Sequence, residues 1–209
     1  MNLDAETLIQ QIPYYLTAED QKVLLDELKA ISCGGTAKYL LSTYRDSFKE
    51  MMLQGDGWRG FQLFLFETGE RRSVRGIVLS NSCDVDPNNP REVPARVIFA
   101  PLVKLAAFKA LLNTSGIGAD RVADKIAAIK AQKTSNIFYL PAGGVLEEDY
   151  VVRFDETHNM PVAAHTASSD REKLFTLSNT GFYMLVFKLS VHFCRLQEKV
   201  NRKPTETAA

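Results

Sequence analysis

The chain has 209 residues, of which 45% are hydrophobic and 24% are charged, and its 25 basic residues balance its 25 acidic residues. These values are typical of a globular protein with one well-buried core, and a net charge of zero argues against a polybasic nucleic-acid binder of the histone type. The three cysteines are too widely spaced for a disulfide framework, and no apolar segment is long enough to span a bilayer. We therefore expect a cytoplasmic protein without a membrane anchor or signal peptide.

Periodic apolar positions predict two helices in the first 54 residues. The first follows Thr17, a hydroxyl N-cap with an acid in the first turn, and ends at Gly34-Gly35. The second runs from about residue 36 to residue 53 and stops at the glycines on either side of Asp56. We therefore expect residues 1–54 to form an N-terminal helical segment.

Short extended runs replace the helical period after residue 57. Residues 61–66 and 72–80 flank a short turn that contains glycine, a pattern typical of a β-hairpin. A polar loop over 81–94 carries three prolines and leads into a strand over 95–100. Pro101 then permits the chain to leave this strand.

The second half of the chain alternates between helical and extended patterns. In chain order we expect a helical run through residues 105–112, a helix over 119–132, strands over 136–140 and 150–154, a loop over 156–170, a strand over 173–177 and a long helix from 178 to about 202. The predicted fold is α+β: a small antiparallel, partly closed barrel of five or six strands, with an N-terminal helical pair, inserted helices and a long C-terminal helix. The barrel domain spans residues 55–203, and residues 204–209 form a frayed tail.

The C-terminal helix carries an apolar stripe that requires a surface to cover it. The stripe consists of Phe182, Leu185, Val186, Leu189, Phe193, Leu196 and Val200. Each large side chain in the stripe would contribute about 1.5–3 kcal/mol on burial before entropy costs, so we expect docking on this domain or on a second copy in a homo-oligomer. Residues 171–203 carry seven basic and two acidic residues, a net charge of +5, whereas residues 1–54 have five basic and eight acidic, a net charge of −3. This asymmetry fits two solvated helices of opposite sign, or a basic face for an acidic partner.

Two central segments resemble a known family. The run Arg75-Gly76-Ile77-Val78-Leu79-Ser80-Asn81 is followed, after a polar loop, by Arg96-Val97-Ile98-Phe99-Ala100-Pro101-Leu102. Over these roughly thirty residues the chain is similar to the centre of the PemK/MazF toxin family. The resemblance implies a small SH3-like barrel and, for most members, a metal-independent endoribonuclease activity.

The chain departs from that family at the positions of its catalytic residues. Val74 stands where the family has an arginine, and Val103 stands where it has a threonine, while Arg72 and Arg75 are out of register. A slip of one residue turns a strand side chain to the opposite face. RNA cleavage through the 2′-hydroxyl needs a base, an acid and a cation, and valine supplies none of these.

The first reading is therefore a non-catalytic binding or regulatory module on a PemK/MazF-like barrel, which contacts nucleic acid or a protein partner in bacterial stress or defence. The alternative is an endoribonuclease of that family with a shifted active site that uses Arg72 or Arg75 and a histidine.

The densest basic cluster in the middle of the chain supplies candidate phosphate contacts. It consists of Arg71, Arg72 and Arg75. The alternative without a binding role is that these arginines are solvated residues on the flank of the hairpin. Trp58 and Arg59 precede the first predicted strand, where an aromatic beside a cation could stack on a base or cap the open end of the barrel.

A second alternative is a cysteine-dependent enzyme centred on Cys83. This residue and Asp84 stand at a loop entrance, where a thiol could act as a nucleophile if His158 or His165 from a distant loop removed its proton. The structural alternative is a small half-buried cysteine, with Asp84 accepting backbone hydrogen bonds in the turn.

The sequence predicts neither a metal nor a cofactor. Oxygen ligands alternate from Asp84 to Asn88 as in a calcium loop, but Asn89 replaces the required glycine and Ala95 the bidentate glutamate. Neither Cys-x-x-Cys nor His-Glu-x-x-His occurs in the chain.

Overall fold

The computed structural model describes Glu19, Lys22, Leu25, Asp26, residues 39–41 and residues 48–193. Within this part of the chain the fold is α+β. The strands are β1 (Gly57–Leu65), β2 (Glu70–Val78), β3 (Arg96–Lys104), β4 (Ile137–Leu140), β5 (Tyr150–Arg153), β6 (His158–Pro161) and β7 (Glu172–Phe175). The helices with both ends inside these residues are α3 (Ser82–Val85), α4 (Leu105–Thr114), α5 (Ala119–Lys130), α6 (Val162–Thr166) and α7 (Asn179–Phe193).

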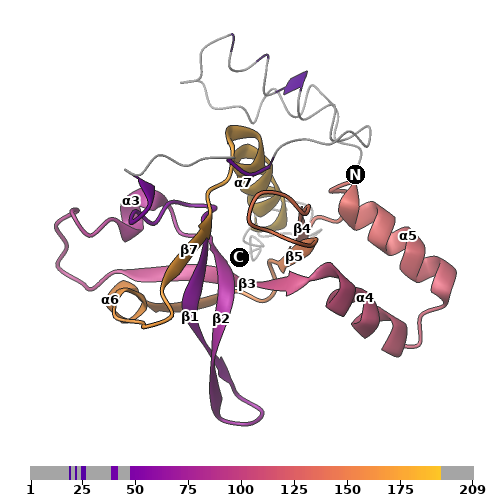
Figure 1. The fold of residues 1–209 in the computed structure, drawn as a ribbon, viewed down its shortest axis with the longest axis horizontal. Coiled ribbons are helices and arrows are strands. Elements are labelled where there is room, and N and C mark those ends of the chain that lie inside the picture. Colours follow the sequence, from indigo (N-terminus) through magenta and orange to yellow (C-terminus); the bar gives the residue numbers. More distant parts are fainter. Residues whose placement is uncertain (1–18, 20–21, 23–24, 27–38, 42–47, 194–209) are drawn as a thin grey trace, which may run out of the picture.

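The seven strands form one antiparallel sheet (Figure 1). Six of them follow the order β4-β5-β3-β2-β1-β7, and the seventh, β6, pairs with β3. The long strand β3 organises this arrangement because its two halves have different neighbours. Its first half pairs with β6 and its second half pairs with β5, both on the edge away from β2. The sheet has seven strands rather than the expected five or six, and it is not closed into a barrel, because β4 and β7 stand at its two ends. The Gln62 N–H of β1 donates to Met160 Sδ of β6 at 3.5 Å.

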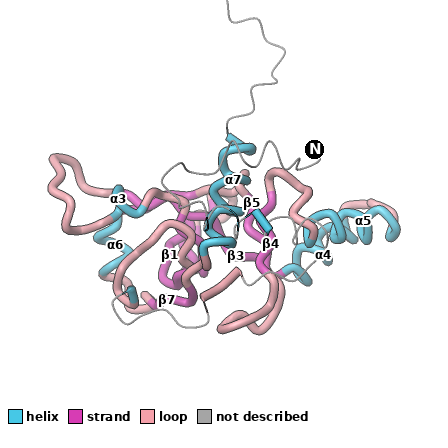
Figure 2. Tube along the Cα trace, turned by 90° about the horizontal axis from the view of Figure 1, so that it is seen from above, coloured by secondary structure: helices cyan, strands magenta, loops and turns pink. Residues whose placement is uncertain are grey.

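Helices cover both faces of the sheet. On one face α7 and Tyr39 pack over a cluster that includes Ile77 and Phe138. On the other face α4 and α5 cover β4 and β5, whereas α3 and α6 lie at the opposite end of the molecule (Figure 2). Strand alternation explains the division, since Ile77 and its neighbour Val78 belong to different clusters.

Most of the predicted elements after residue 57 are confirmed, with shifted ends. The hairpin, the strands at 136–140 and 150–154 and the helices after residue 105 form, the last of them as far as Phe193, where the described residues end. The expected end of a strand at Pro101 is wrong, because β3 continues through it to Lys104. Pro101 is tolerated there because it is opposite Gly76 in the last pair with β2, after which β3 pairs with β5.

Two sequence-based predictions are corrected. The expected loop over 156–170 contains β6 and α6, which form because β6 completes the pairing of the first half of β3. The helix expected over 36–53 is absent from its described residues, since Leu40 forms a β-bridge with Leu177 and the Leu41 N–H donates to Thr176 O at 3.0 Å. Glu19, Lys22, Leu25 and Asp26, the described residues of the first predicted helix, are helical. The other residues of the segment up to residue 38, residues 42–47 and residues 194–209 lie outside the described residues.

The described part of the C-terminal helix docks on the sheet of its own chain. Met184 and Leu185 of α7 are buried in the cluster that contains Ile77. Phe193, its last residue, is 62% exposed. No helix among the described residues is long and apolar enough to cross a membrane.

Candidate nucleic-acid interface

Strands β1 and β2 extend beyond the rest of the sheet as a protruding β-ribbon (Figure 1). β1 pairs with β7 only through residues 57–59, and β2 pairs with β3 only through residues 76–78. Among the described strands, residues 61–65 and 70–74 therefore pair only with each other. Both faces of this ribbon are accessible near its tip.

A β-bulge sets the side-chain directions at the base of the ribbon. Trp58 pairs with Gly76, and Phe61 pairs with Val74. Three steps along β1 thus match two along β2, and Gly60 within the bulge has a φ of +89°. The extra residue lets Trp58 and Phe61 face the same apolar cluster, although side chains three apart in a regular strand point to opposite faces.

One face of the ribbon combines exposed aromatic rings with arginines. Phe64 lies directly opposite Arg71, and strand alternation places Arg75 on the same face of β2. Phe64 is 44% exposed and Phe66 in the turn is 87% exposed; their ring centroids are 5.0 Å apart in an edge-on arrangement. We call Phe64, Phe66, Arg71 and Arg75 the ribbon face.

The two arginines of the ribbon face have no carboxylate partner among the described residues. Arg75 donates from Nη1 to the Tyr150 hydroxyl at 3.3 Å. Arg72 points to the opposite face and pairs with Glu70 at 3.0 Å. Arg71 and Arg75 thus offer the uncompensated positive charge on this part of the surface.

A polar pocket of about 510 Å³ adjoins the base of the ribbon face. It is lined by Arg59, Ser73, Val74, Arg75, Ser169, Asp170, Arg171 and Glu172. Arg59 pairs with Glu172 at 2.9 Å, and Arg171 pairs with Glu50 at 2.8 Å. Arg75 is the arginine of the pocket that has no carboxylate partner among the described residues, so its positive charge is available to an anionic group.

Trp58 lies beneath this pocket rather than on its surface. Only 1% of the residue is exposed, and the Arg171 guanidinium stands 4.5 Å from its ring centroid. Lys173 Nζ is 5.6 Å from the same ring. An indole covered in this way cannot stack on a base. Trp58 is therefore not part of the candidate interface, whereas Arg59 lies at its edge.

His165 is a core residue of the same region. It is fully buried, its ring stacks on Phe61 at 4.6 Å, and its Nε2 lies 2.9 Å from the Arg59 carbonyl oxygen. Nε2–H is the donor in this contact, because a carbonyl oxygen only accepts. Burial lowers the pKa of His165, so the imidazole is neutral and holds the bulge in place.

The cysteine-centred candidates are not brought together by any described contact. Cys83 is exposed at the start of α3, and its N–H donates to Asn81 Oδ1 at 2.9 Å. Asp84 is exposed beside it, and its carbonyl oxygen accepts from Arg91. His158 pairs with Phe99 across the β6–β3 ladder, and no described hydrogen bond or ring contact joins Cys83 to either histidine.

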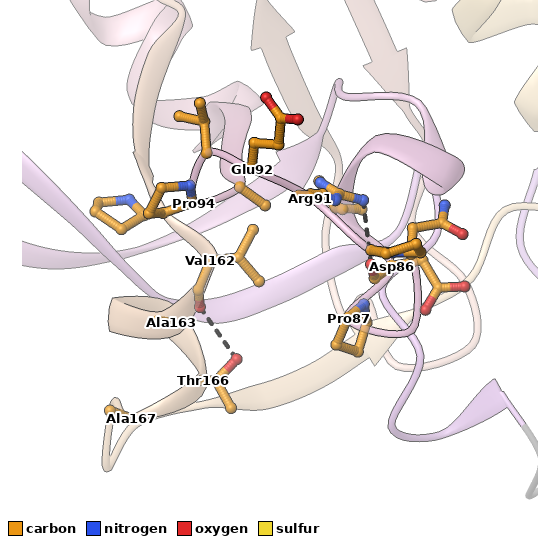
Figure 3. Close-up of a pocket in the computed structure, with 15 residues that line it drawn as sticks. Asp86, Pro87, Arg91, Glu92, Pro94, Val162, Ala163, Thr166 and Ala167 are labelled. Atoms are coloured by element: carbon orange, nitrogen blue, oxygen red, sulfur yellow. Dashed lines mark hydrogen bonds between the residues drawn. The ribbon is translucent and has the colours of Figure 1, made fainter.

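A second pocket of about 730 Å³ lies between the proline-containing loop after α3 and the helix α6 (Figure 3). Its walls are mainly apolar and include Pro87, Pro94 and Val162. Arg91, another lining residue, donates to the carbonyl oxygen of Asp86 at 3.1 Å. No cluster of catalytic side chains faces this groove among its lining residues.

The sequence predicts the arginines of the ribbon face but not Phe64 and Phe66. The run 61–66 is rich in aromatics and predicts a strand, but not which of its side chains are exposed. Gln62 carried the missing signal, because a polar residue within the run marks the exposed face on which residues 64 and 66 also lie.

The described residues contain no group of three or more His, Cys, Asp or Glu side chains that could hold a metal ion. No protein-family model matches the chain, and no curated protein matches it either.

Proposed function

We propose that the chain is a non-catalytic nucleic-acid-binding module whose contact surface is the ribbon face. One observation carries this proposal. Two arginines that have no carboxylate partner among the described residues lie beside exposed phenylalanine rings on the same face of a protruding ribbon. Arginine supplies the phosphate contact, and an exposed ring supplies a stacking surface for a base. A net charge of zero is compatible with this surface because the positive charge is local.

The open seven-stranded sheet is proposed to be related to the SH3-like barrel of the PemK/MazF family. Its support is the resemblance of the two central segments and the hydrogen bond between β1 and β6. The role in bacterial stress or defence rests on that resemblance alone. We retain it as part of the proposal.

The non-catalytic form is favoured by what surrounds the arginines. His165 is buried against Phe61, and His158 lies on β6 rather than on the ribbon. Val74 and Val103 occupy the positions where the family has its arginine and threonine. No described histidine therefore contacts Arg75, and the carboxylates of the adjoining pocket are those of Asp170 and of Glu172, which pairs with Arg59.

Binding to labelled mixed-sequence RNA and to single-stranded DNA of the same length, in EDTA, tests the proposal. The double variant Arg71→Ala/Arg75→Ala should weaken binding about tenfold or more, since each contact to a charged group is worth roughly 1.5–3 kcal/mol. The control Arg121→Ala/Lys125→Ala removes the same charge from the exposed side of α5. Equal losses in both variants, or no binding by the wild type, would overturn the proposal.

The same incubation separates the two enzymatic alternatives. RNA cleavage that disappears in Arg72→Ala/Arg75→Ala would establish a nuclease with a shifted site in place of a binding module. Cleavage or another activity that disappears in Cys83→Ala would establish the cysteine-centred reading.

A further inference from the structure

Two lysines are buried among the described residues, and their surroundings differ. Lys173 of β7 is 8% exposed, and Lys188 of α7 is 3% exposed. A buried ammonium ion needs acceptors for its three N–H groups and a compensating negative charge, whereas a neutral amine needs acceptors for only two. The number and type of the acceptors therefore indicate the protonation state.

The environment of Lys173 is that of an ammonium ion. Its Nζ lies 2.7 Å from Asp56 Oδ2, 2.7 Å from the carbonyl oxygen of Phe48 and 3.0 Å from that of Met51. The Trp58 ring adds a cation–π contact. Three acceptors, one of them a carboxylate, match the three donors of a charged lysine.

The environment of Lys188 is that of a neutral amine. Its Nζ lies 2.8 Å from Gln132 Oε1 and 3.1 Å from the Gln132 carbonyl oxygen. Neither acceptor carries a charge, and no carboxylate reaches the nitrogen among the described residues. Two acceptors match the two N–H groups of an uncharged amine, and a third proton on this nitrogen would have no acceptor.

Gln132 is held rigidly enough to impose this geometry. Its Nε2 donates to the Tyr139 carbonyl oxygen at 2.7 Å and to the Tyr39 hydroxyl at 3.3 Å, while its Oε1 accepts from the Tyr139 N–H at 3.2 Å. Both amide protons are thus engaged, and Oε1 accepts from Tyr139 and Lys188. Gln132 also has a φ of +58°, directly after α5. The side chain cannot rotate to serve a third donor without breaking these bonds.

No charged group on the neighbouring elements compensates a proton on Lys188. Beyond Tyr139, Lys130 pairs with Asp149 at 2.8 Å, and that carboxylate is engaged there. Lys133 after α5 is exposed, and His192 on the next turn of α7 packs on Phe154.

The two tyrosines that contact Gln132, Tyr39 and Tyr139, do not compensate a proton on Lys188 either. Burial raises the pKa of Tyr39 and of Tyr139, so both phenols are neutral. Burial alone lowers the pKa of Lys188 to about 7.

We infer that α7 is docked through the neutral amine of Lys188, and that uptake of one proton by this amine loosens the helix from the junction of α5 and β4. The seat of α7 is thereby a proton-sensitive contact, independent of the ribbon face. Acidification expels Lys188 because a charged nitrogen at this position has neither a counter-ion nor a third acceptor. At higher pH the amine keeps both hydrogen bonds to Gln132.

The sign of the effect follows from the two protonation states. In the unfolded chain the lysine has its ordinary pKa of 10.5, and in the folded chain it titrates near 7. Between these values the unfolded chain binds one more proton, so stability rises with pH. The unfolding constant should fall by up to about tenfold per pH unit in this window and level off below it.

Urea unfolding of the full chain at several pH values from 6 to 9.5, followed by the fluorescence of its single tryptophan, tests the inference. Lys188→Met should lose most of this pH dependence, whereas Lys133→Met, an exposed neighbour of Gln132, should keep it. The same slope in wild type and in Lys188→Met would overturn the inference.

A measurement on the wild type keeps the test decisive where Lys188→Met fails to fold. The ¹³Cε signals of labelled lysines should include one that titrates two or more pH units below the rest. In hydrogen exchange, the protection of the α7 amides should fall on acidification more than that of β2 and β3. If every lysine titrates near its ordinary pKa, or α7 keeps pace with the central strands, the helix is not proton-linked.

Discussion

Lys173 Nζ lies 2.7 Å from Asp56 Oδ2 in an ion pair whose side chains are 2% and 0% exposed. The pair ties β7 to the residue that precedes β1, and Lys173 also donates to two backbone carbonyl groups of the segment before Asp56. The pair therefore holds β7 against the start of β1, the strand that continues into the ribbon. Breaking a buried pair leaves an uncompensated charge, which costs more than the pair itself contributes.

Single substitutions of this pair should be among the most destabilising in the chain. We expect Asp56→Asn or Lys173→Met to lower the free energy of unfolding by about 3–5 kcal/mol. Urea denaturation measures the loss, and the double variant Asp56→Asn/Lys173→Met should recover part of it because no charge remains buried. Additive losses in the double variant would show that the two residues do not act as a pair.

Gly60 should be intolerant of a side chain for two separate reasons. Its φ is +89°, and a Cβ there would lie 3.0 Å from Ser168 Oγ and 3.1 Å from the Arg171 nitrogen. Gly69 in the ribbon turn has a φ of +70° but open space around it, so Gly69→Ala measures the backbone strain alone.

We expect Gly69→Ala to cost about 1 kcal/mol and Gly60→Ala distinctly more in thermal or urea unfolding. The difference between the two variants isolates the crowding at the bulge. Equal losses would mean that the segment around Arg171 yields without cost.

The hairpin could be predicted from the sequence because alternating apolar residues flank a glycine turn. β6 could not, since Met160 is its one buried residue, and the strand exists because β3 offers a free edge. Lys188 is a similar case: it lies outside the predicted apolar stripe of α7, and a lysine is expected to face solvent, but it is buried on the same face as Met184 and Leu185. Its acceptors come from Gln132, 56 residues away in the chain.

The candidate site was predictable only in part for the same reason. Consecutive residues revealed the arginine cluster, but not that Arg72 and Arg75 point to opposite faces or that Glu70 neutralises one of them. The burial of Trp58 depends on the cations of β7 and the segment before it, which no local pattern indicates.

Acid should destabilise the fold through His165 as well. Burial lowers the pKa of this histidine below its ordinary value of 6.5, so the unfolded chain takes up a proton that the folded chain refuses. The free energy of unfolding should therefore fall as pH drops through about 6.5.

The variant His165→Leu should lose this component and should also cost about 1–3 kcal/mol at neutral pH, since the Arg59 carbonyl oxygen loses its donor. His158→Gln, at a partly exposed position on β6, is the matched control. Unfolding curves at pH 5.0 and 7.5 decide the matter: an unchanged pH dependence in His165→Leu would place the acid sensitivity elsewhere.

Phe64 gives the sharpest test of how the ribbon face binds, because it is exposed and its removal leaves the core intact. In the proposed complex its ring stacks on a base, and such a contact is worth about 1–3 kcal/mol by alanine substitution. Phe64→Ala should therefore weaken binding to single-stranded RNA by about fivefold or more without changing the salt dependence.

Arg71→Ala should instead lower the slope of log affinity against log salt by nearly one, since one phosphate contact is lost. Leu111→Ala on α4, an apolar side chain that is 58% exposed, controls for the general loss of apolar surface. If Phe64→Ala leaves affinity intact while Arg71→Ala reduces it, the ribbon contacts the nucleic-acid backbone alone.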